Sequence, residues 1–95
     1  MIEVEVSLNK ITVIGHAGYA PKGNDIVCAA VSALTQALMM GLDQIAGMRI
    51  ATCEKPGNIC IEWQHANDVG KALIDTWFIG ICKIADSYEN YIKVI

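Results

Sequence analysis

A histidine and a cysteine stand at the two ends of one short glycine-containing segment, "HAGYAPKGNDIVC", which runs from His16 to Cys28. A cysteine thiolate is a nucleophile, and a neighbouring imidazole can accept the thiol proton and later protonate a leaving amine. The pair therefore supplies the two groups needed for a cysteine nucleophile and its general base. Considered alone, Cys28 is more simply a packing residue, because cysteine is among the most buried residue types and no spacing rule links it to His16.

The residues around this pair predict rigid elements at both ends of the segment. Lys10–Ile14 is an apolar, β-branched run that predicts a strand ending just before His16. Asp25 is a good N-cap, and the apolar spacing after it predicts a helix that ends near Gly41. Cys28 then lies in the first turn of that helix, where unpaired N–H groups and the helix dipole favour a negative charge on sulfur.

The loop between strand and helix, residues 17–24, carries glycines at positions 18 and 23. Such a loop can fold the imidazole back over the thiol and can move when a substrate arrives. The spacing of Gly18 and Gly23 also matches the two glycines of a phosphate-binding P-loop. However, Asn24 and Asp25 follow where a P-loop needs Lys and Ser or Thr, and a carboxylate there repels phosphate. We therefore reject phosphate binding.

Cys28 lies on the less apolar side of its predicted helix. Ser32, then Thr35 or Gln36, and Met39 recur at helical spacing on that side. Cys28 thus shares a face with Ser32 and not with the leucines, so the thiol need not be a core residue.

The other histidine and cysteines predict no second site. We interpret His65, which follows the fourth predicted strand, as a surface residue. No C-x-x-C spacing is present, so we expect neither a metal nor a cofactor. A turn at Pro56 and Gly57 would place Cys53 opposite Cys60, close enough for a disulfide. A reducing compartment favours two reduced thiols there instead.

The composition is that of one small domain, residues 1–95, with a surplus of apolar groups. Hydrophobic residues make up 54% and charged residues 18%, which predicts a homodimer interface or an apolar groove. The net charge of -3 argues against nucleic acid as the direct partner and suits a basic protein substrate. We find no uninterrupted apolar run of membrane-spanning length and no signal-peptide pattern, so we expect no membrane segment and a cytoplasmic location.

The hydrophobic pattern predicts four strands and two helices in the order β-β-α-β-β-α, an α+β fold with a mixed sheet made from two hairpins and packed with two helices. A right-handed crossover through the first helix predicts that strands two and three are parallel neighbours. Asn67 or Asp68 caps the second helix. Its predicted inward stripe is Val69, Leu73, Trp77, Gly80 or Ile81, Ile84 and Tyr88.

The segment "GHA", the loop to Gly23 and "DIVCAAVSAL" resemble, without a gap, the ribosomal-processing cysteine proteases known as the Prp family. The flanking hairpins and the terminal "YIKVI" resemble the ends of that family, so the likeness covers essentially the whole chain. The resemblance places the catalytic histidine on His16 and the nucleophile on Cys28. The supporting positions are Ser32, Asp25, Gly23 and Gly15, and Gly18 and Tyr19 lie in the substrate-gating loop.

The resemblance implies a cysteine endopeptidase that removes the N-terminal extension of a large-subunit ribosomal protein during bacterial ribosome maturation. It also implies a homodimer with a loop that orders over the substrate. Asp25 is expected to cap and orient the helix and not to act as a base, because a carboxylate near the sulfur opposes thiolate formation. Two alternatives stay open: a non-catalytic ribosome-assembly adaptor, and a phage-type relative that processes capsid or scaffold proteins.

Overall fold

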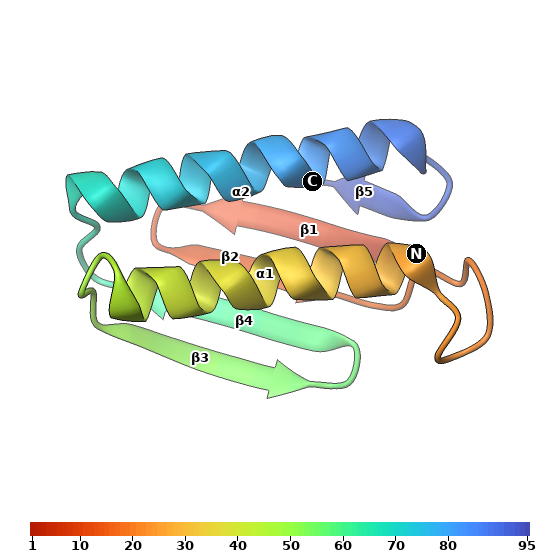
Figure 1. Cartoon of the computed structure of the whole chain (residues 1–95), viewed down its shortest axis with the longest axis horizontal. Helices are drawn as coiled ribbons and strands as arrows, with labels where there is room; N and C mark the ends of the chain where they lie inside the picture. Colours follow the sequence, from red (N-terminus) through yellow and green to blue (C-terminus); the bar gives the residue numbers. More distant parts are fainter.

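Two helices cover one face of a five-stranded sheet and leave the other face open (Figure 1). The structure is a computed structural model that describes residues 1–95. The predicted α+β fold is confirmed, with one strand more than expected. In chain order the elements are β1 (Ile2–Ser7), β2 (Lys10–Ile14), α1 (Ile26–Gln44), β3 (Ile50–Lys55), β4 (Asn58–Trp63), α2 (Asp68–Ser87) and β5 (Ile92–Val94).

β5 is the strand that the hydrophobic pattern did not predict. It has three residues and pairs in parallel with β1, with Ile92 opposite Ile2. Ile2 N also donates to Tyr91 O at 2.9 Å, which ties the start of β1 to the same segment. A strand this short has too few residues to show an alternating pattern, and the apolar stripe of α2 runs directly into it.

The neighbour of β2 in the sheet is β4 and not β3. The order is β3-β4-β2-β1-β5, and β2 pairs antiparallel with β4. The prediction of β2 and β3 as parallel neighbours was therefore wrong: the strands run in the same direction, but β4 lies between them. β4 buries Ile59, Ile61 and Trp63, whereas β3 buries no residue. The apolar strand gains more burial in the interior of the sheet, and the polar strand suits an edge.

α1 begins after its predicted N-cap, Asp25, and ends at Gln44, beyond the predicted end near Gly41. Gly41 is buried where the helices cross, and a Cβ there would lie 3.4 Å from Leu73 Cδ1. The chain reverses instead at Gly47, whose φ of 63° is in the left-handed region that glycine adopts readily.

α1 is also the one helix whose length and hydropathy would suffice to cross a membrane. A central helix of a folded domain meets the same criterion. Here Val27, Val31 and Leu42 of α1 are buried in the core between the helices and the sheet.

α2 begins after Asn67, whose side chain accepts a 2.8 Å hydrogen bond from Gly70 N. The predicted stripe was wrong at its first position, because Val69 is exposed and Gly70 is buried. Gly70 lies against Met48 Sδ, where a Cβ would not fit. The other inward positions are confirmed as buried or half-buried residues of the core: Leu73, Trp77, Ile81, Ile84 and Tyr88.

One buried polar link joins the two helices. Trp77 Nε1 donates to Thr35 Oγ1 at 3.1 Å, and Thr35 Oγ1 donates to Val31 O at 2.7 Å. Thr35 is therefore a core residue and does not lie on the Cys28 face of α1. Of the two residues that the sequence left open for that face, Gln36 is the one that occupies it.

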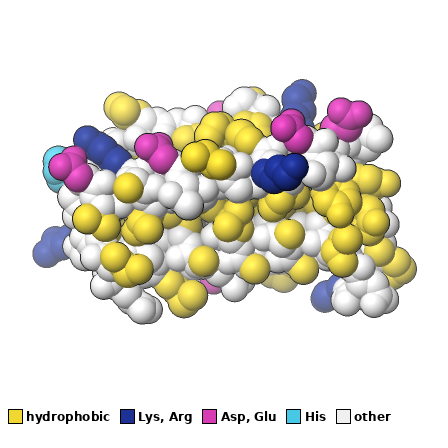
Figure 2. All heavy atoms as spheres, turned by 45° about the horizontal axis from the view of Figure 1, so that its top comes forward, with side chains coloured by type: hydrophobic (Ala, Val, Ile, Leu, Met, Phe, Trp, Pro, Cys, Tyr) yellow, Lys and Arg dark blue, Asp and Glu magenta, His cyan; other side chains and the backbone are white.

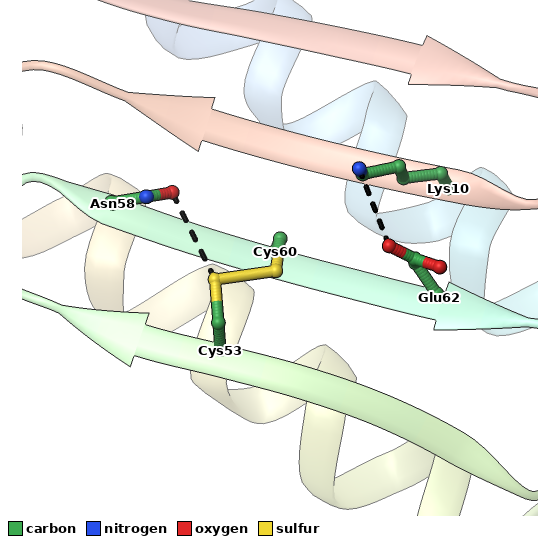
Figure 3. The surroundings of a disulfide bond; sticks show 5 residues. All are labelled: Lys10, Cys53, Asn58, Cys60 and Glu62. Atoms are coloured by element: carbon green, nitrogen blue, oxygen red, sulfur yellow. Dashed lines mark hydrogen bonds and ion pairs between the residues drawn. A yellow bond between two sulfur atoms is a disulfide. The ribbon is translucent and has the colours of Figure 1, made fainter.

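The β3–β4 hairpin carries a disulfide between Cys53 and Cys60, on the sheet face away from the helices (Figure 3). The predicted register is confirmed, with the two residues directly opposite each other and their Cα atoms 5.0 Å apart. The expectation of two reduced thiols was wrong for this structure, because this pairing brings the Cα atoms within the usual disulfide range. Cys28 and Cys82 are free thiols.

Candidate active site

Three segments meet at one end of the molecule and enclose a hollow of about 950 Å³. They are the loop that follows β2, the first turns of α1 and the β3–β4 turn, which lie together at the right of Figure 1. His16 and Cys28 both line this hollow, and Ser32 and Gln36 line it one and two helical turns after Cys28. The structure thus brings the two predicted reactive side chains to one site.

Cys28 lies in the first turn of α1 and is half-buried. Ala17 N–H donates to Cys28 Sγ at 3.2 Å, so a backbone donor from the loop points at the sulfur. A donor in this position stabilises a thiolate more than a neutral thiol, because it places positive partial charge against the sulfur. Together with the start of the helix, it makes Cys28 suited to nucleophilic chemistry.

Asp25 caps α1 and also holds the loop. Its Oδ1 accepts 3.0 Å hydrogen bonds from Val27 N and Cys28 N, and its Oδ2 accepts one of 3.0 Å from Tyr19 N. The N–H of Cys28, followed by those of Tyr19 and Ala20, holds the pKa of Asp25 below its ordinary value of 3.8. The expected capping role is confirmed by this geometry, and an ionised carboxylate engaged by several donors is a poor base.

His16 is exposed and rests against the β3–β4 turn. A Cβ on Gly57 would lie 2.7 Å from His16 Nε2, so a side chain there would push the imidazole out of this position. Gly15 N donates to Gly57 O at 2.9 Å, which fixes the end of β2 to the same turn. Gly15 itself has a φ of 101° and packs against Met1 O, so it is a structural position in which a side chain would clash.

His16 and Cys28 line the same hollow without a hydrogen bond between them. The lining of the hollow also includes one polar pair, in which Gln36 Nε2 donates to Glu54 Oε1 at 2.8 Å. This bond links α1 to the edge strand β3 and closes one side of the hollow. Ser32 stands between Cys28 and Gln36 on the same helix face, as expected.

The predicted gating loop divides into two parts. Gly18 and Gly23 line the hollow, whereas Tyr19 turns away from it, and its ring packs edge-on against Tyr88 and Tyr91. Gly18 and Gly23 have φ values of 71° and 92°, which explains the glycines there. Tyr19 therefore does not line the hollow in this structure.

A family model described as cysteine protease Prp matches residues 1–93 of the chain. The chain belongs to this family.

Two curated members match a shorter stretch. Ribosomal processing cysteine protease Prp from Mycoplasma pneumoniae is 59% identical over 34 residues, which are 36% of this chain and 34% of that protein. The protein of the same name from Mycoplasma genitalium is 50% identical over a stretch of the same length. The matched stretch spans about a third of these curated relatives.

Solved structures confirm the fold over almost the whole chain. The essential ribosomal processing protease Prp from Staphylococcus aureus, solved with a covalently linked product peptide, has a TM-score of 0.88 at 21% identity. That match covers 98% of this chain and 94% of the other. A Streptococcus mutans protein has a TM-score of 0.78 at 25% identity, and the match covers 99% and 91% of the two chains. The Prp fold is thus present in this chain from β1 to β5.

Sequence patterns did not reveal two sets of contacts at this site, those of Gly57 and those of Tyr88 and Tyr91. Gly57 belongs to a hairpin turn that the sequence predicts, but its contact with His16 depends on the position of β4 beside β2. The Tyr88 and Tyr91 contacts with Tyr19 depend equally on the unpredicted pairing of β5 with β1. His65 lies at a second hollow formed with Arg49 and Asn67, apart from Cys28, as a surface residue would.

Proposed function

We propose that this protein is a cysteine endopeptidase that removes the N-terminal extension of a large-subunit ribosomal protein, with Cys28 as nucleophile and His16 as general base and acid. The observation that carries the proposal is the single hollow lined by both side chains, with the Ala17 N–H directed at Cys28 Sγ. Ser32 supports the pair as a hydroxyl on the same helix face.

In the proposed reaction the Cys28 thiol transfers its proton to His16, and the thiolate attacks the scissile carbonyl carbon. The imidazolium then protonates the leaving amine, so that the C–N bond breaks and an acyl group stays on sulfur. Water, deprotonated by His16, releases the acyl group and restores the thiol. Because no hydrogen bond joins the two side chains, the imidazole and Cys28 Sγ must come closer before the proton is transferred.

The oxyanion that forms in this reaction needs N–H donors other than that of Cys28. Cys28 N already donates to Asp25 Oδ1, and Ala29 N donates to Asp25 O at 3.1 Å. The N–H groups at the start of α1 are thus largely engaged in hydrogen bonds to Asp25, its N-cap. The Ala17 N–H already donates to the sulfur. It is therefore the donor best placed to hydrogen-bond the oxyanion when the negative charge moves from sulfur to the carbonyl oxygen.

The family and the charge balance support the proposed substrate. The curated Mycoplasma members are named ribosomal processing proteases, and the Staphylococcus aureus protein has been solved with a substrate peptide. A net charge of -3 complements the basic character typical of ribosomal proteins. With such a substrate we also propose a cytoplasmic location, without direct binding of nucleic acid or membrane.

We further propose a homodimer. α1 carries no charged residue from Ile26 to Leu42, and nine of its 19 residues are exposed. Figure 2 shows hydrophobic side chains spread over the face that the helices form, with most charged side chains toward its upper edge and its ends. The exposed apolar residues of α1 are Ile26, Ala29, Ala30, Ala33, Ala37 and Met40. An apolar face of this kind is typical of an interface between subunits.

Mass spectrometry of a ribosomal protein with its extension, before and after incubation with this chain, tests the proposed activity. Cleavage at one position, absent with the His16→Ala variant, is the expected result. An uncleaved substrate that nevertheless binds the chain would support the adaptor instead and contradict the protease. Light scattering at micromolar concentration tests the dimer, and a monomer would contradict it.

A further inference from the structure

The loop between β2 and α1 is fixed at its beginning and free at its far end. Ala17 is 4% exposed and donates its N–H to Cys28 Sγ, while Tyr19 N donates to Asp25 Oδ2. In contrast, residues 21–24 are all exposed, and their one backbone hydrogen bond outside the helix, from Asn24 N to Pro21 O, is internal. The first three loop residues therefore form one docked arm, residues 17–19.

The side chain of Tyr19 supplies a third attachment for this arm. Its ring lies edge-on to Tyr91 with centroids 5.2 Å apart, and edge-on to Tyr88 with centroids 5.5 Å apart. Both geometries are those that aromatic rings prefer. Tyr19 as a whole is 41% exposed, so the contact covers part of its side chain and leaves the rest open to solvent.

The two tyrosines that receive Tyr19 form a rigid platform. Tyr88 is the C-cap of α2, and its N–H donates to Ile84 O. Tyr91 N donates to Tyr88 O at 2.9 Å, and Tyr91 O accepts from Ile2 N at 2.9 Å. The platform is thus fixed to both α2 and strand β1, whereas residues 21–24 have no such support.

We infer that Tyr19 is a positioning residue, whose ring anchors residues 17–19 on Tyr88 and Tyr91 and so keeps the Ala17 N–H on Cys28 Sγ. The inference rests on the proposed function of Cys28 for its catalytic consequence. It also limits which part of the loop can open to residues 21–24, while the arm next to the sulfur stays in place.

Hydrogen exchange measured by NMR on the full chain tests the anchor directly. Replacing Tyr19 by alanine removes both ring contacts, so Tyr19→Ala should speed exchange of the Ala17 amide by about tenfold. The amide of Val13 in β2 should exchange as in the wild type, which shows that the fold is intact. Tyr19→Phe keeps the ring and should behave as the wild type. An unchanged Ala17 amide in Tyr19→Ala, or a fast one in Tyr19→Phe, would overturn the inference.

A chemical readout connects the anchor to the sulfur. Alkylation of Cys28 by iodoacetamide, followed by peptide mass spectrometry, should be slower in Tyr19→Ala than in Tyr19→Phe near neutral pH, because the thiolate loses its donor. Alkylation of Cys82 in the same sample should be equal in both variants. Equal rates at Cys28 would contradict the role of the anchor. Both readouts are independent of peptide cleavage. A wild type that cleaves no substrate would therefore contradict the proposed protease activity, and hydrogen exchange would still test the role of Tyr19.

Discussion

Gly57 and His16 are in contact across the site: a Cβ on Gly57 would lie 2.7 Å from the Nε2 atom of the imidazole. The β3–β4 turn thus forms the surface on which His16 rests, and the hydrogen bond from Gly15 N to Gly57 O holds that turn to the end of β2. A residue 41 positions later in the chain therefore limits where the imidazole of the proposed general base can lie.

The first prediction concerns this contact. Gly57→Ala should displace the imidazole and lower kcat/KM by about tenfold or more, because a base out of place loses the rate that positioned proton transfer supplies. Gly47→Ala is the matched control, since Gly47 also has a positive φ but has open space around it. Both glycines lie in the left-handed region, with φ values of 72° for Gly57 and 63° for Gly47, so equal activity in the two variants would contradict the contact with His16.

A second prediction follows from the lowered pKa of Asp25. Its ionised form accepts the N–H groups of Cys28, Val27 and Tyr19, so it contributes stability above its ordinary pKa of 3.8. That contribution is lost as the pH falls through the lower pKa of the folded protein. Thermal melts should show the wild type more stable than Asp25→Asn at about pH 7, with the difference shrinking toward about pH 3. Asp75→Asn, on the exposed side of α2, should show no such convergence.

The third prediction tests the buried link between the helices. Thr35→Val keeps the size of the side chain but leaves Trp77 Nε1 without its acceptor, which should lower the free energy of unfolding by about 1–3 kcal/mol. Thr35→Ser retains the hydroxyl and should lose less. Urea denaturation measures both. A Thr35→Val protein as stable as the wild type would show that the hydrogen bond contributes nothing.

The thiols provide a fourth prediction. With Cys53 and Cys60 joined, an Ellman titration of the denatured, unreduced protein should count two thiols, those of Cys28 and Cys82. After reduction by dithiothreitol the count should rise to four, the total in the sequence. A count of four before reduction would mean that the pair is reduced in the protein as purified.

Local sequence signals predicted the parts of the site that depend on neighbouring residues. Asp25 as N-cap, Cys28 in the first turn and the shared face of Cys28 and Ser32 all follow from capping and helical spacing, and the structure has each of them. The β3–β4 register, with Cys53 opposite Cys60, follows in the same way from the turn at Pro56 and Gly57.

The features that sequence could not supply depend on which strands lie side by side. Placing β4 beside β2 brings Gly57 under His16, and pairing β5 with β1 brings Tyr91 to Tyr19. Neither pairing is encoded in an alternating pattern, because several arrangements of two hairpins bury the same apolar residues. The orientation of Tyr19 away from the hollow likewise depends on contacts with residues far away in the sequence.

The central claim is that Cys28 is the nucleophile. The most direct measurement is mass spectrometry of an extended ribosomal protein incubated with the wild type, with Cys28→Ala and with the control Cys82→Ala, which removes the other free thiol. We predict one specific cut with the wild type and with Cys82→Ala, and none with Cys28→Ala while that variant melts as the wild type does. Cleavage by Cys28→Ala at the same position would contradict the account.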